Sequence, residues 1–362
     1  MKRKTLGLGM ASIMAVGVLS TAAMSSTAFA GNPVGNPGQK GSLLIYPNIR
    51  AGAGQDTLIT LTNDSAVGVL LKCYYASSDP LATPNSSTAA QIRPFKHFGD
   101  FTINITHNQP ISWWASTGLA YANSQRSAGS IAPPFGNPFP DGQTRTAGEL
   151  KCWAITDDGS TQKSHNHLFG TASIWSGGGQ ANEYTAYAFQ NAAAAEAVTA
   201  TPGVLNLNNV DYDACPNILL GNFQAAGSGT TRVTLASCNQ DLRQAYTPTI
   251  TKLTWTFFNQ DENARTGTHW CADSWYETSF PAAGWPYTTT LGLGTETGYF
   301  RIETTADTQV CGPSAVTSSY VGVIEQTTGG GFLRGTNLTG RGSIAGVILY
   351  DTSPPDSSLT AQ

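Results

Sequence analysis

The sequence predicts an all-β protein made of two tandem immunoglobulin-like β-sandwich domains stapled by disulfides. Only 12% of its 362 residues are charged, while Thr, Ser, Asn and Gly are abundant. This composition is typical of strands that present hydroxyl and amide groups to water. Short runs of strand-forming residues are separated by Gly, Asn and Pro turns at intervals of about 8–12 residues, which favours sandwiches or barrels. The six cysteines are an even number, as a disulfide framework requires.

The N-terminus has the pattern of a cleaved signal peptide. Three basic residues at 2–4 precede an apolar stretch at 6–23, which ends at the small-x-small motif Ala28-Phe29-Ala30. We therefore expect residues 1–30 to be removed and the mature chain to begin at Gly31. The expected location is periplasmic or extracellular, and the form of the leader favours a bacterial source.

Charge and hydropathy exclude some classes of partner. The predicted leader holds three of the 19 Lys and Arg and none of the 23 Asp and Glu, so the mature chain carries a net charge of about −7. Nucleic acids and anionic lipids need a basic face, so neither is an expected partner. No run after the leader reaches about 18 apolar residues, so no transmembrane helix is expected in the mature chain.

Composition shifts divide the chain into segments. A Gly/Pro/Asn-rich start predicts a flexible lead-in, and the run of four alanines near residue 193 breaks the strand pattern. The Ser/Pro/Asp-rich end predicts disorder. The expected order is a lead-in at 31–41, a first β-sandwich domain at 42–190, a linker at 191–203, a second β-sandwich domain at 204–350 and a disordered tail at 351–362.

The first domain contains the clearest strand patterns. In 98–106, Phe101, Ile103 and Ile105 fall on one face and polar residues on the other. The runs 168–175 and 183–190 flank Ser176-Gly177-Gly178-Gly179, which predicts a hairpin. The strands expected in this domain are 42–46, 56–62, 67–75, 98–106, 110–115, 149–156, 168–175 and 183–190.

The second domain repeats this style, most clearly where Ile250, Lys252 and Thr254 alternate with Thr251, Leu253 and Trp255. The strands expected there are 204–207, 218–224, 231–236, 250–258, 298–304, 320–327 and 343–350.

Disulfides are the default state of the cysteines of an exported protein. The expected participants are Cys73, Cys152, Cys215, Cys238, Cys271 and Cys311. Cys73 and Cys152 both follow Leu-Lys and precede an aromatic residue, and they are the two cysteines of the first domain. We expect them to pair, which in the chain-entropy model stabilises the fold by about 4 kcal/mol. Spacing leaves the other pairings open.

A metal site is the sharpest chemical hypothesis. His165 and His167 would point to the same face of a strand and could chelate copper or zinc, with His97 and His107 completing the site. The alternative is a solvated polar loop. Calcium is a second hypothesis, because residues 259–263 place oxygen ligands at alternate positions, although the Gly and Glu of a calcium-binding loop are absent.

Aromatic residues offer a binding surface. Trp113 and Trp114 are adjacent, so on a strand one faces the core and the other faces outward. A second group lies among Gly and Pro, which predicts a loop whose exposed rings could stack on sugars or dock a partner protein. The alternative is that these rings pack between sheets. The candidate binding residues of this group are Trp275, Tyr276, Trp285 and Tyr287.

The segments 212–216, 234–242 and 258–262, together with Trp270-Cys271, resemble a loose group of secreted bacterial all-β proteins with no known activity. The resemblance implies an exported β-protein and offers no catalytic residue. The chain also lacks the G-x-S-x-G motif of a nucleophile elbow.

We therefore expect a non-catalytic structural or binding protein of the surface, matrix or adhesion type, with other envelope proteins or glycans as partners. The alternative is a secreted carbohydrate-active or metal-dependent enzyme that uses residues 118–148 and 259–287.

Overall fold

Every regular element of the described residues is a β-strand, so the expectation of an all-β fold is confirmed. Most strands of the first half also lie where the sequence patterns predict them. The computed structural model describes residues 34–52, 54–78, 96–119, 132–135, 145–191, 203–207, 209, 211–216, 218–224, 229–242, 250–259, 264–272, 274–280, 297–311, 318–328, 331–344 and 347–349.

The strands of the N-terminal half are β1 (Leu43–Gly52), β2 (Gln55–Asn63), β3 (Val69–Ser78), β4 (Lys96–Ile105), β5 (Gln109–Trp114), β6 (Ala147–Ile155), β7 (Leu168–Ser176), β8 (Ala181–Thr185) and β9 (Tyr187–Phe189).

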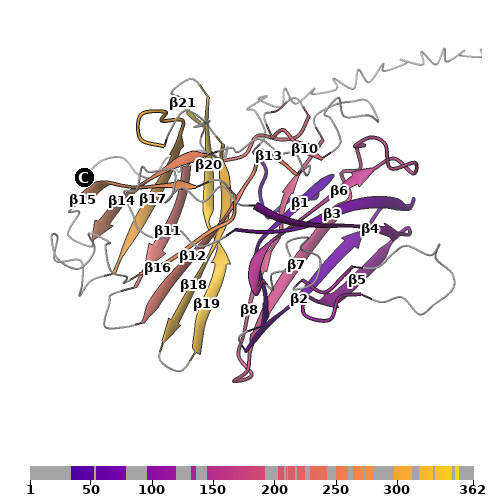
Figure 1. Cartoon of the computed structure of the whole chain (residues 1–362), viewed down its shortest axis with the longest axis horizontal. Coiled ribbons are helices and arrows are strands. Elements are labelled where there is room, and N and C mark those ends of the chain that lie inside the picture. The colour runs from indigo at the N-terminus through magenta and orange to yellow at the C-terminus, as the bar shows by residue number, and fades with distance from the viewer. Residues whose placement is uncertain are drawn as a thin grey trace, which may run out of the picture. The chain divides into compact units, whose positions relative to one another are not determined.

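They form one sheet path in the order β4-β3-β6-β1-β2-β7-β8, with β5 paired to β2 and β9 paired to β1 (Figure 1). The path turns at the hairpin between β1 and β2, where Ala51 pairs with Asp56. The expected hairpin between residues 168–175 and 183–190 is present, because Trp175 pairs with Ala181 across the glycine turn.

The strands of the C-terminal half are β10 (Val204–Leu205), β11 (Ile218–Phe223), β12 (Thr230–Ser237), β13 (Gln240–Asp241), β14 (Thr251–Asn259), β15 (Ala264–Ala272), β16 (Tyr276–Phe280), β17 (Gly298–Thr305), β18 (Tyr320–Thr328), β19 (Gly331–Asn337), β20 (Thr339–Ile344) and β21 (Val347–Leu349).

Two sheets hold most of these strands, in the orders β15-β14-β17-β11-β20-β21 and β16-β12-β18-β19, and β10 pairs with β13. All named strand pairs in both halves are antiparallel, which allows short connections between neighbours.

Four strands had no counterpart in the sequence patterns: β13, β15, β16 and β19. Residues 343–350, expected as one strand, are divided between the end of β20 and β21.

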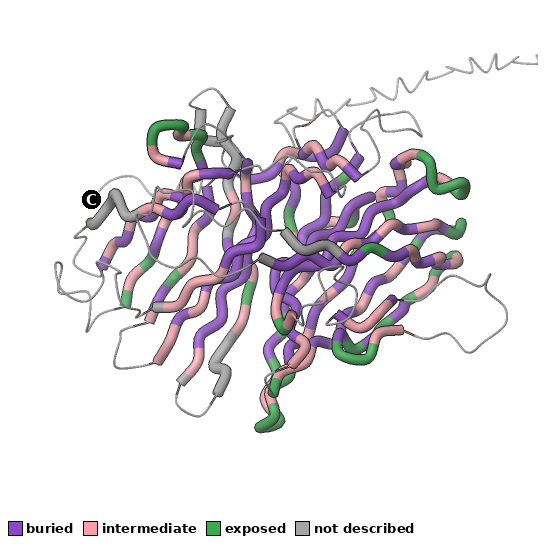
Figure 2. The backbone as a smooth tube through the Cα atoms, viewed as in Figure 1, coloured by how far each residue is buried: buried purple, intermediate pink, exposed green. Residues whose placement is uncertain are grey.

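Buried and less buried positions alternate along the strands (Figure 2), and the three largest buried apolar clusters of the described residues follow from this alternation. The first is built mainly from the N-terminal half, with residues such as Leu61, Leu71 and Ile103, and it also includes Val323 of β18. The second lies within the C-terminal half and includes Trp255 and Phe300.

A third cluster draws on both halves: Leu43, Ile45 and Trp153 pack with residues such as Tyr212 and Val321. The strand β18 shows the consequence, since Val321 belongs to the shared cluster and Ile324 to the second one. Both faces of β18 are therefore buried, and residues 32–362 form one compact unit.

Three disulfides join Cys73 to Cys152, Cys215 to Cys238 and Cys271 to Cys311. The first is the expected pair, and its two residues lie directly opposite each other on β3 and β6. Three disulfides indicate an oxidising, extracytoplasmic environment. Among the described residues, no helix has the length and apolar character needed to cross a membrane.

Several segments named in the sequence analysis lie outside the described residues: 1–30, most of the linker 191–203, the tail 351–362 and much of 118–148. Of the expected lead-in, residues 34–41 are described. The backbone N–H of Gly35 donates to the carbonyl of Ala214, and that of Asn36 donates to the carbonyl of Ala188.

Candidate functional site

The two histidines of the metal hypothesis lie just before β7, but they do not face a common ligand. The buried ring of His165 donates its Nε2 hydrogen to Asn63 Oδ1 at 2.8 Å. The exposed ring of His167 contacts Asp64 Oδ1 through Nδ1 at 3.1 Å. Burial lowers the pKa of His165 to about 4, and the positive charges of His167 and Lys163 add to this effect.

The other two histidines lie elsewhere. His107 is exposed in the turn that links β4 to β5, and the side chain of His97 is outside the described residues. In the part of the chain that the structure describes, no group of three or more His, Cys, Asp or Glu side chains could hold a metal ion. Of the calcium hypothesis, only Asn259 at the end of β14 is described.

The predicted aromatic binding residues are buried where they are described. Trp275 and Tyr276 lie at the start of β16 with less than a tenth of each side chain exposed. The indole N–H of Trp275 donates to the carbonyl of Pro47 at 2.8 Å. These two residues therefore follow the alternative of packing against sheets; Tyr276 is the first residue of β16, and Trp275 directly precedes it. Trp285 and Tyr287 lie outside the described residues.

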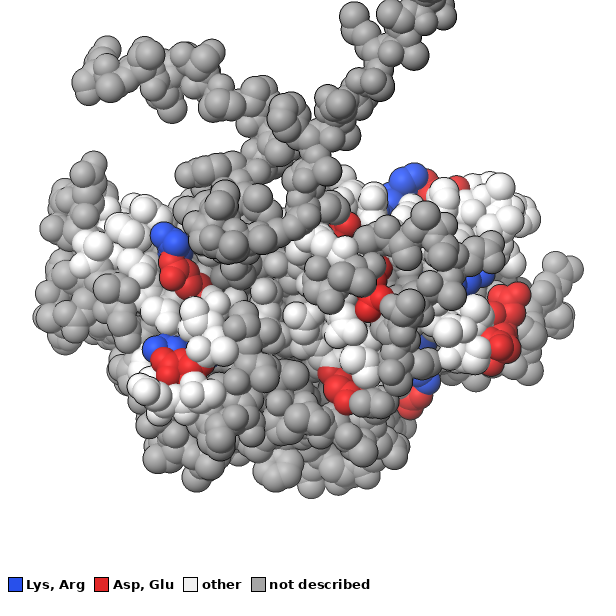
Figure 3. Space-filling model, turned by 90° about the horizontal axis from the view of Figure 1, so that it is seen from above, with Lys and Arg blue, Asp and Glu red and all other residues white. Residues whose placement is uncertain are grey.

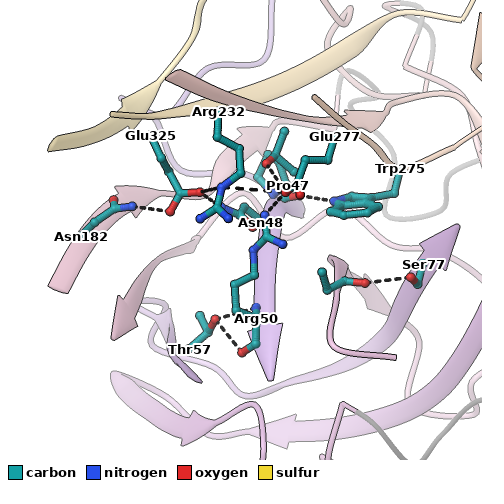
Figure 4. Close-up of polar contacts among 12 residues, drawn as sticks. Pro47, Asn48, Arg50, Thr57, Ser77, Asn182, Arg232, Trp275, Glu277 and Glu325 are labelled. Atoms are coloured by element: carbon teal, nitrogen blue, oxygen red, sulfur yellow. Dashed lines mark hydrogen bonds and ion pairs between the residues drawn. The ribbon is translucent and has the colours of Figure 1, made fainter. Parts of the chain in front are cut away.

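Trp275 belongs to a buried polar cluster that the sequence reasoning missed (Figure 4). Its origin is an irregularity in β1, where the pairing with β6 shifts register between Tyr46 and Ile49. Proline has no N–H to donate to a ladder, so Pro47 favours such a break. The freed backbone groups find other partners: the carbonyl of Pro47 accepts from Trp275, and Asn48 bonds through both its N–H and its carbonyl to the Tyr184 hydroxyl.

Two arginines and two glutamates form the centre of this cluster. Arg50 of β1 pairs with Glu277 of β16. Glu325 of β18 accepts hydrogen bonds from Arg232 at 2.7 Å, from Asn48 at 3.0 Å and from Asn182 at 2.6 Å. Opposite charges are balanced within a nearly closed interior, and the donors satisfy both oxygens of Glu325, which is the condition for burying a charge without a large penalty.

The environment of Arg50 shows how closed the cluster is. Burial and, to a smaller extent, the charge of Arg232 lower the pKa of the Arg50 guanidinium to about 10, while Glu325 partly opposes them. Each charged group has a protein partner, and Arg50 and Glu325 are more deeply buried than Arg232 and Glu277. The cluster joins β1 and β8 of the first half to β12, β16 and β18 of the second, so its evident role is to hold these strands in register.

Three exposed aromatic side chains lie on a different surface, the outer face of the sheet β5-β2-β7-β8. We name this the aromatic face. Trp114, Phe169 and Trp175 are 37%, 40% and 43% exposed there. The clean alternation of β2, β5 and β7 directs these rings outward while Trp113, Ala172 and Ile174 enter the core. The expectation that one residue of the Trp113-Trp114 pair faces outward is confirmed.

Trp114 and Trp175 meet edge to face across β2, with ring centroids 6.2 Å apart. Register explains the contact: Trp114 lies opposite Leu58, and Trp175 lies opposite Asp56, one pleat further along β2. Two indoles on flanking strands can therefore touch over the strand between them.

Hydroxyls and carboxylates surround these rings. Thr60 and Thr171 face each other with their hydroxyl oxygens 2.9 Å apart. Ser173 donates to the exposed carboxylate of Glu183 at 2.6 Å, and Asp56 accepts from the backbone N–H of Ser116 at 3.0 Å. The aromatic face thus combines apolar rings with acceptors and donors on a rigid sheet. The alternation of 168–175 could have identified Phe169 and Trp175 as outward residues once their strand was assigned.

No family model matches the chain, and no curated protein matches it at a significant level. Among solved structures, the chain is similar to one in the cryo-EM atomic structure of Broad Bean Stain Virus, with 9% identity over 90% of this chain and 97% of that chain. The TM-score of that match is 0.18, so it carries no argument about fold or function.

Proposed function

We propose that this chain is an exported, non-catalytic binding protein of the cell surface or matrix, and that it binds glycans through the aromatic face. The proposal includes a cleaved signal peptide at residues 1–30 and two tandem immunoglobulin-like sandwiches as the scaffold. The observation that carries it is the exposed pair Trp114 and Trp175 on a sheet face that also carries hydroxyls and carboxylates.

The chemistry of this face favours a sugar over other partners. The C–H face of a sugar ring packs on an indole, while its hydroxyls exchange hydrogen bonds with groups such as Thr171, Ser173 and Glu183. Figure 3 shows that charged side chains lie scattered among uncharged ones, with blue patches beside red ones. On that face, the described residues do not form the basic stripe that an anionic polymer needs.

Affinity electrophoresis of the mature protein tests the proposal. Native gels would contain hydroxyethyl cellulose, xylan, dextran or soluble peptidoglycan fragments. We expect one of these polymers to retard the protein, and the double substitution Trp114→Ala/Trp175→Ala to weaken binding at least about tenfold, which corresponds to about 1.4 kcal/mol. Assay of reducing ends after prolonged incubation should detect no cleavage.

Tyr299→Ala is the matched control, because Tyr299 is as exposed as Trp175 but stacks on Phe258 in the other half of the chain. It should bind like the wild type. Failure of all polymers to retard the protein, or equal binding by the double variant, would overturn the glycan proposal. Release of new reducing ends would overturn its non-catalytic part.

A further inference from the structure

A fully buried lysine lies where the two halves of the chain meet. Lys151 is at the centre of β6, which pairs with β1 on one side and β3 on the other. Its neighbours Leu150 and Cys152 face the first apolar cluster, so Lys151 faces the opposite way, as does Trp153 of the shared cluster. Its side chain has no solvent exposure. Burying an ammonium in such a place costs free energy unless a partner of opposite charge compensates it or a reaction removes the charge.

Glu149 and Gln240, both among the described residues, contact the amine of Lys151. The carboxylate of Glu149, two residues earlier on the same face of β6, accepts from Nζ at 2.9 Å and is itself fully buried. The side-chain carbonyl of Gln240 on β13 contacts the same nitrogen. The amide nitrogen of Gln240 donates to the Ser274 hydroxyl at 2.7 Å, which fixes the orientation of the amide. Gln240 is only 2% exposed.

We propose that Lys151 and Gln240 form an intramolecular amide crosslink between β6 and β13. The Lys151 amine attacks the side-chain carbonyl carbon of Gln240, a new C–N bond forms, and the C–N bond to the original amide nitrogen breaks. Glu149 takes one proton from the Lys151 ammonium, which frees the attacking amine, and keeps it. The second proton that this nitrogen loses as the amide forms passes to the departing nitrogen, which leaves as ammonia. The reaction exchanges one amide for another, so it needs neither an oxidant nor a co-reactant.

The surroundings favour this reaction in three ways. The fold holds the amine against the amide, which replaces the entropic cost of an encounter. Exclusion of water keeps hydrolysis from competing with attack by the amine. A carboxylate within hydrogen-bond distance of the amine supplies the proton transfer. The product also removes a charged donor from a closed interior.

Lys72 shows that the local sequence alone does not create this arrangement. It lies in the same Leu-Lys-Cys-aromatic sequence on β3, yet a quarter of its side chain is exposed and it pairs with Asp100. Lys72 is therefore a matched control for substitution of Lys151.

Mass spectrometry of the purified full mature chain, after reduction and alkylation, tests the proposal. The intact mass should be lower than the sequence mass by that of one ammonia molecule per chain. Proteolysis should yield a branched peptide in which Lys151 and Gln240 are joined, with no cleavage after Lys151 by trypsin. Recovery of both residues in separate, unmodified peptides would overturn the proposal, and so would a mass deficit without the branched peptide.

Variants separate the roles of the three residues. The Glu149→Gln variant should keep the side-chain nitrogen of Gln240, so it should show its full sequence mass and give unbranched peptides. If that variant folds poorly, Glu149→Gln/Lys151→Met removes both buried charges together and should fold with the full mass. Lys72→Met should still form the crosslink. A branched peptide at undiminished yield in Glu149→Gln would remove Glu149 from the proposed mechanism and overturn its role as proton carrier.

Discussion

At the residue scale, His165 shows how a polar side chain suggested as a ligand becomes part of the scaffold. Its ring donates to Asn63 Oδ1, while the amide of Asn63 donates to the carbonyls of Val67 at 2.8 Å and Thr106 at 3.0 Å. The histidine thus completes a network that fixes the end of β2. The spacing of His165 and His167 suggested shared chemistry, but pairing with Asn63 depends on the contact between β2 and β7, which local spacing does not contain.

This environment predicts a pH-dependent stability. An unfolded chain leaves His165 near its ordinary pKa of 6.5, while burial lowers it to about 4 in the folded protein. The unfolded state therefore binds a proton first as pH falls. The contribution of His165 to the free energy of unfolding is therefore complete above pH 6.5. It is lost as the pH falls from 6.5 toward 4, and the total loss is about 3 kcal/mol. Urea unfolding followed by tryptophan fluorescence at a series of pH values would measure this loss.

The comparison with His165→Gln isolates the histidine from the carboxylates that titrate nearby. The variant should be less stable at neutral pH but should lose less stability between pH 6.5 and 4. His107→Gln, at an exposed turn, should keep the wild-type pH dependence. If the free energy of unfolding fell equally with pH in the wild type and in His165→Gln, burial of His165 would not be the cause of the pH dependence between 6.5 and 4.

At the element scale, the alternation of apolar and polar residues predicted the strands that expose one face to water. It did not predict strands that are held in a sheet mainly by pairing with their neighbours. The strands β2, β5 and β7 alternate in sequence because one side meets the core and the other meets water. By contrast, β15 has the sequence ARTGTHWCA and β19 has GFLRGTN. Their Gly and polar residues resemble loops, and pairing with β14 and β18 assigns them to sheets.

The packing of β7 on β2 leads to a prediction at Gly170. A Cβ placed there would lie 2.1 Å from the Tyr46 hydroxyl oxygen and 2.2 Å from the carbonyl oxygen of Thr60. Those two atoms are hydrogen-bonded to each other at 2.7 Å. Gly170→Ala must therefore displace a buried tyrosine or separate two paired strands, and we expect a loss of about 1–3 kcal/mol in the free energy of unfolding.

Urea unfolding of Gly170→Ala beside Gly178→Ala provides the measurement. Gly178 lies in the turn of the same hairpin, where an added Cβ would have no heavy atom within 4 Å, so its variant should remain within about 0.5 kcal/mol of the wild type. Equal stability of the two variants would contradict the close approach of β2 and β7 at this position.

At the scale of the whole molecule, the two halves share interior side chains. Trp153 and Tyr187 of the first half pack in one cluster with Tyr212 and Val321 of the second. The Tyr187 hydroxyl lies 2.7 Å from the carbonyl oxygen of Gly322 and 2.8 Å from that of Leu338. Composition predicted two tandem domains, and the sequence patterns contained no sign of these contacts, because the partners lie far apart along the chain.

We expect this shared interior to make the halves unfold together. Glu325 is the critical group, because Arg232, Asn48 and Asn182 all donate to it. Glu325→Ala would leave a partly buried arginine and two buried amides without their acceptor, at a cost of about 3–5 kcal/mol. Since Asn48 and Asn182 belong to the first half and Glu325 to the second, the loss falls on the contact between them.

Differential scanning calorimetry tests this coupling. The wild type should give a single transition whose calorimetric and van't Hoff enthalpies agree, whereas Glu325→Ala should give a lower Tm and two resolved transitions. Glu183→Ala removes an exposed glutamate of β8 that bonds to Ser173 of the same half, and should keep the single transition. Two transitions in the wild type would mean that the shared interior contributes too little to couple the halves. A single unshifted transition in Glu325→Ala would mean that the apolar cluster couples them without the buried ions.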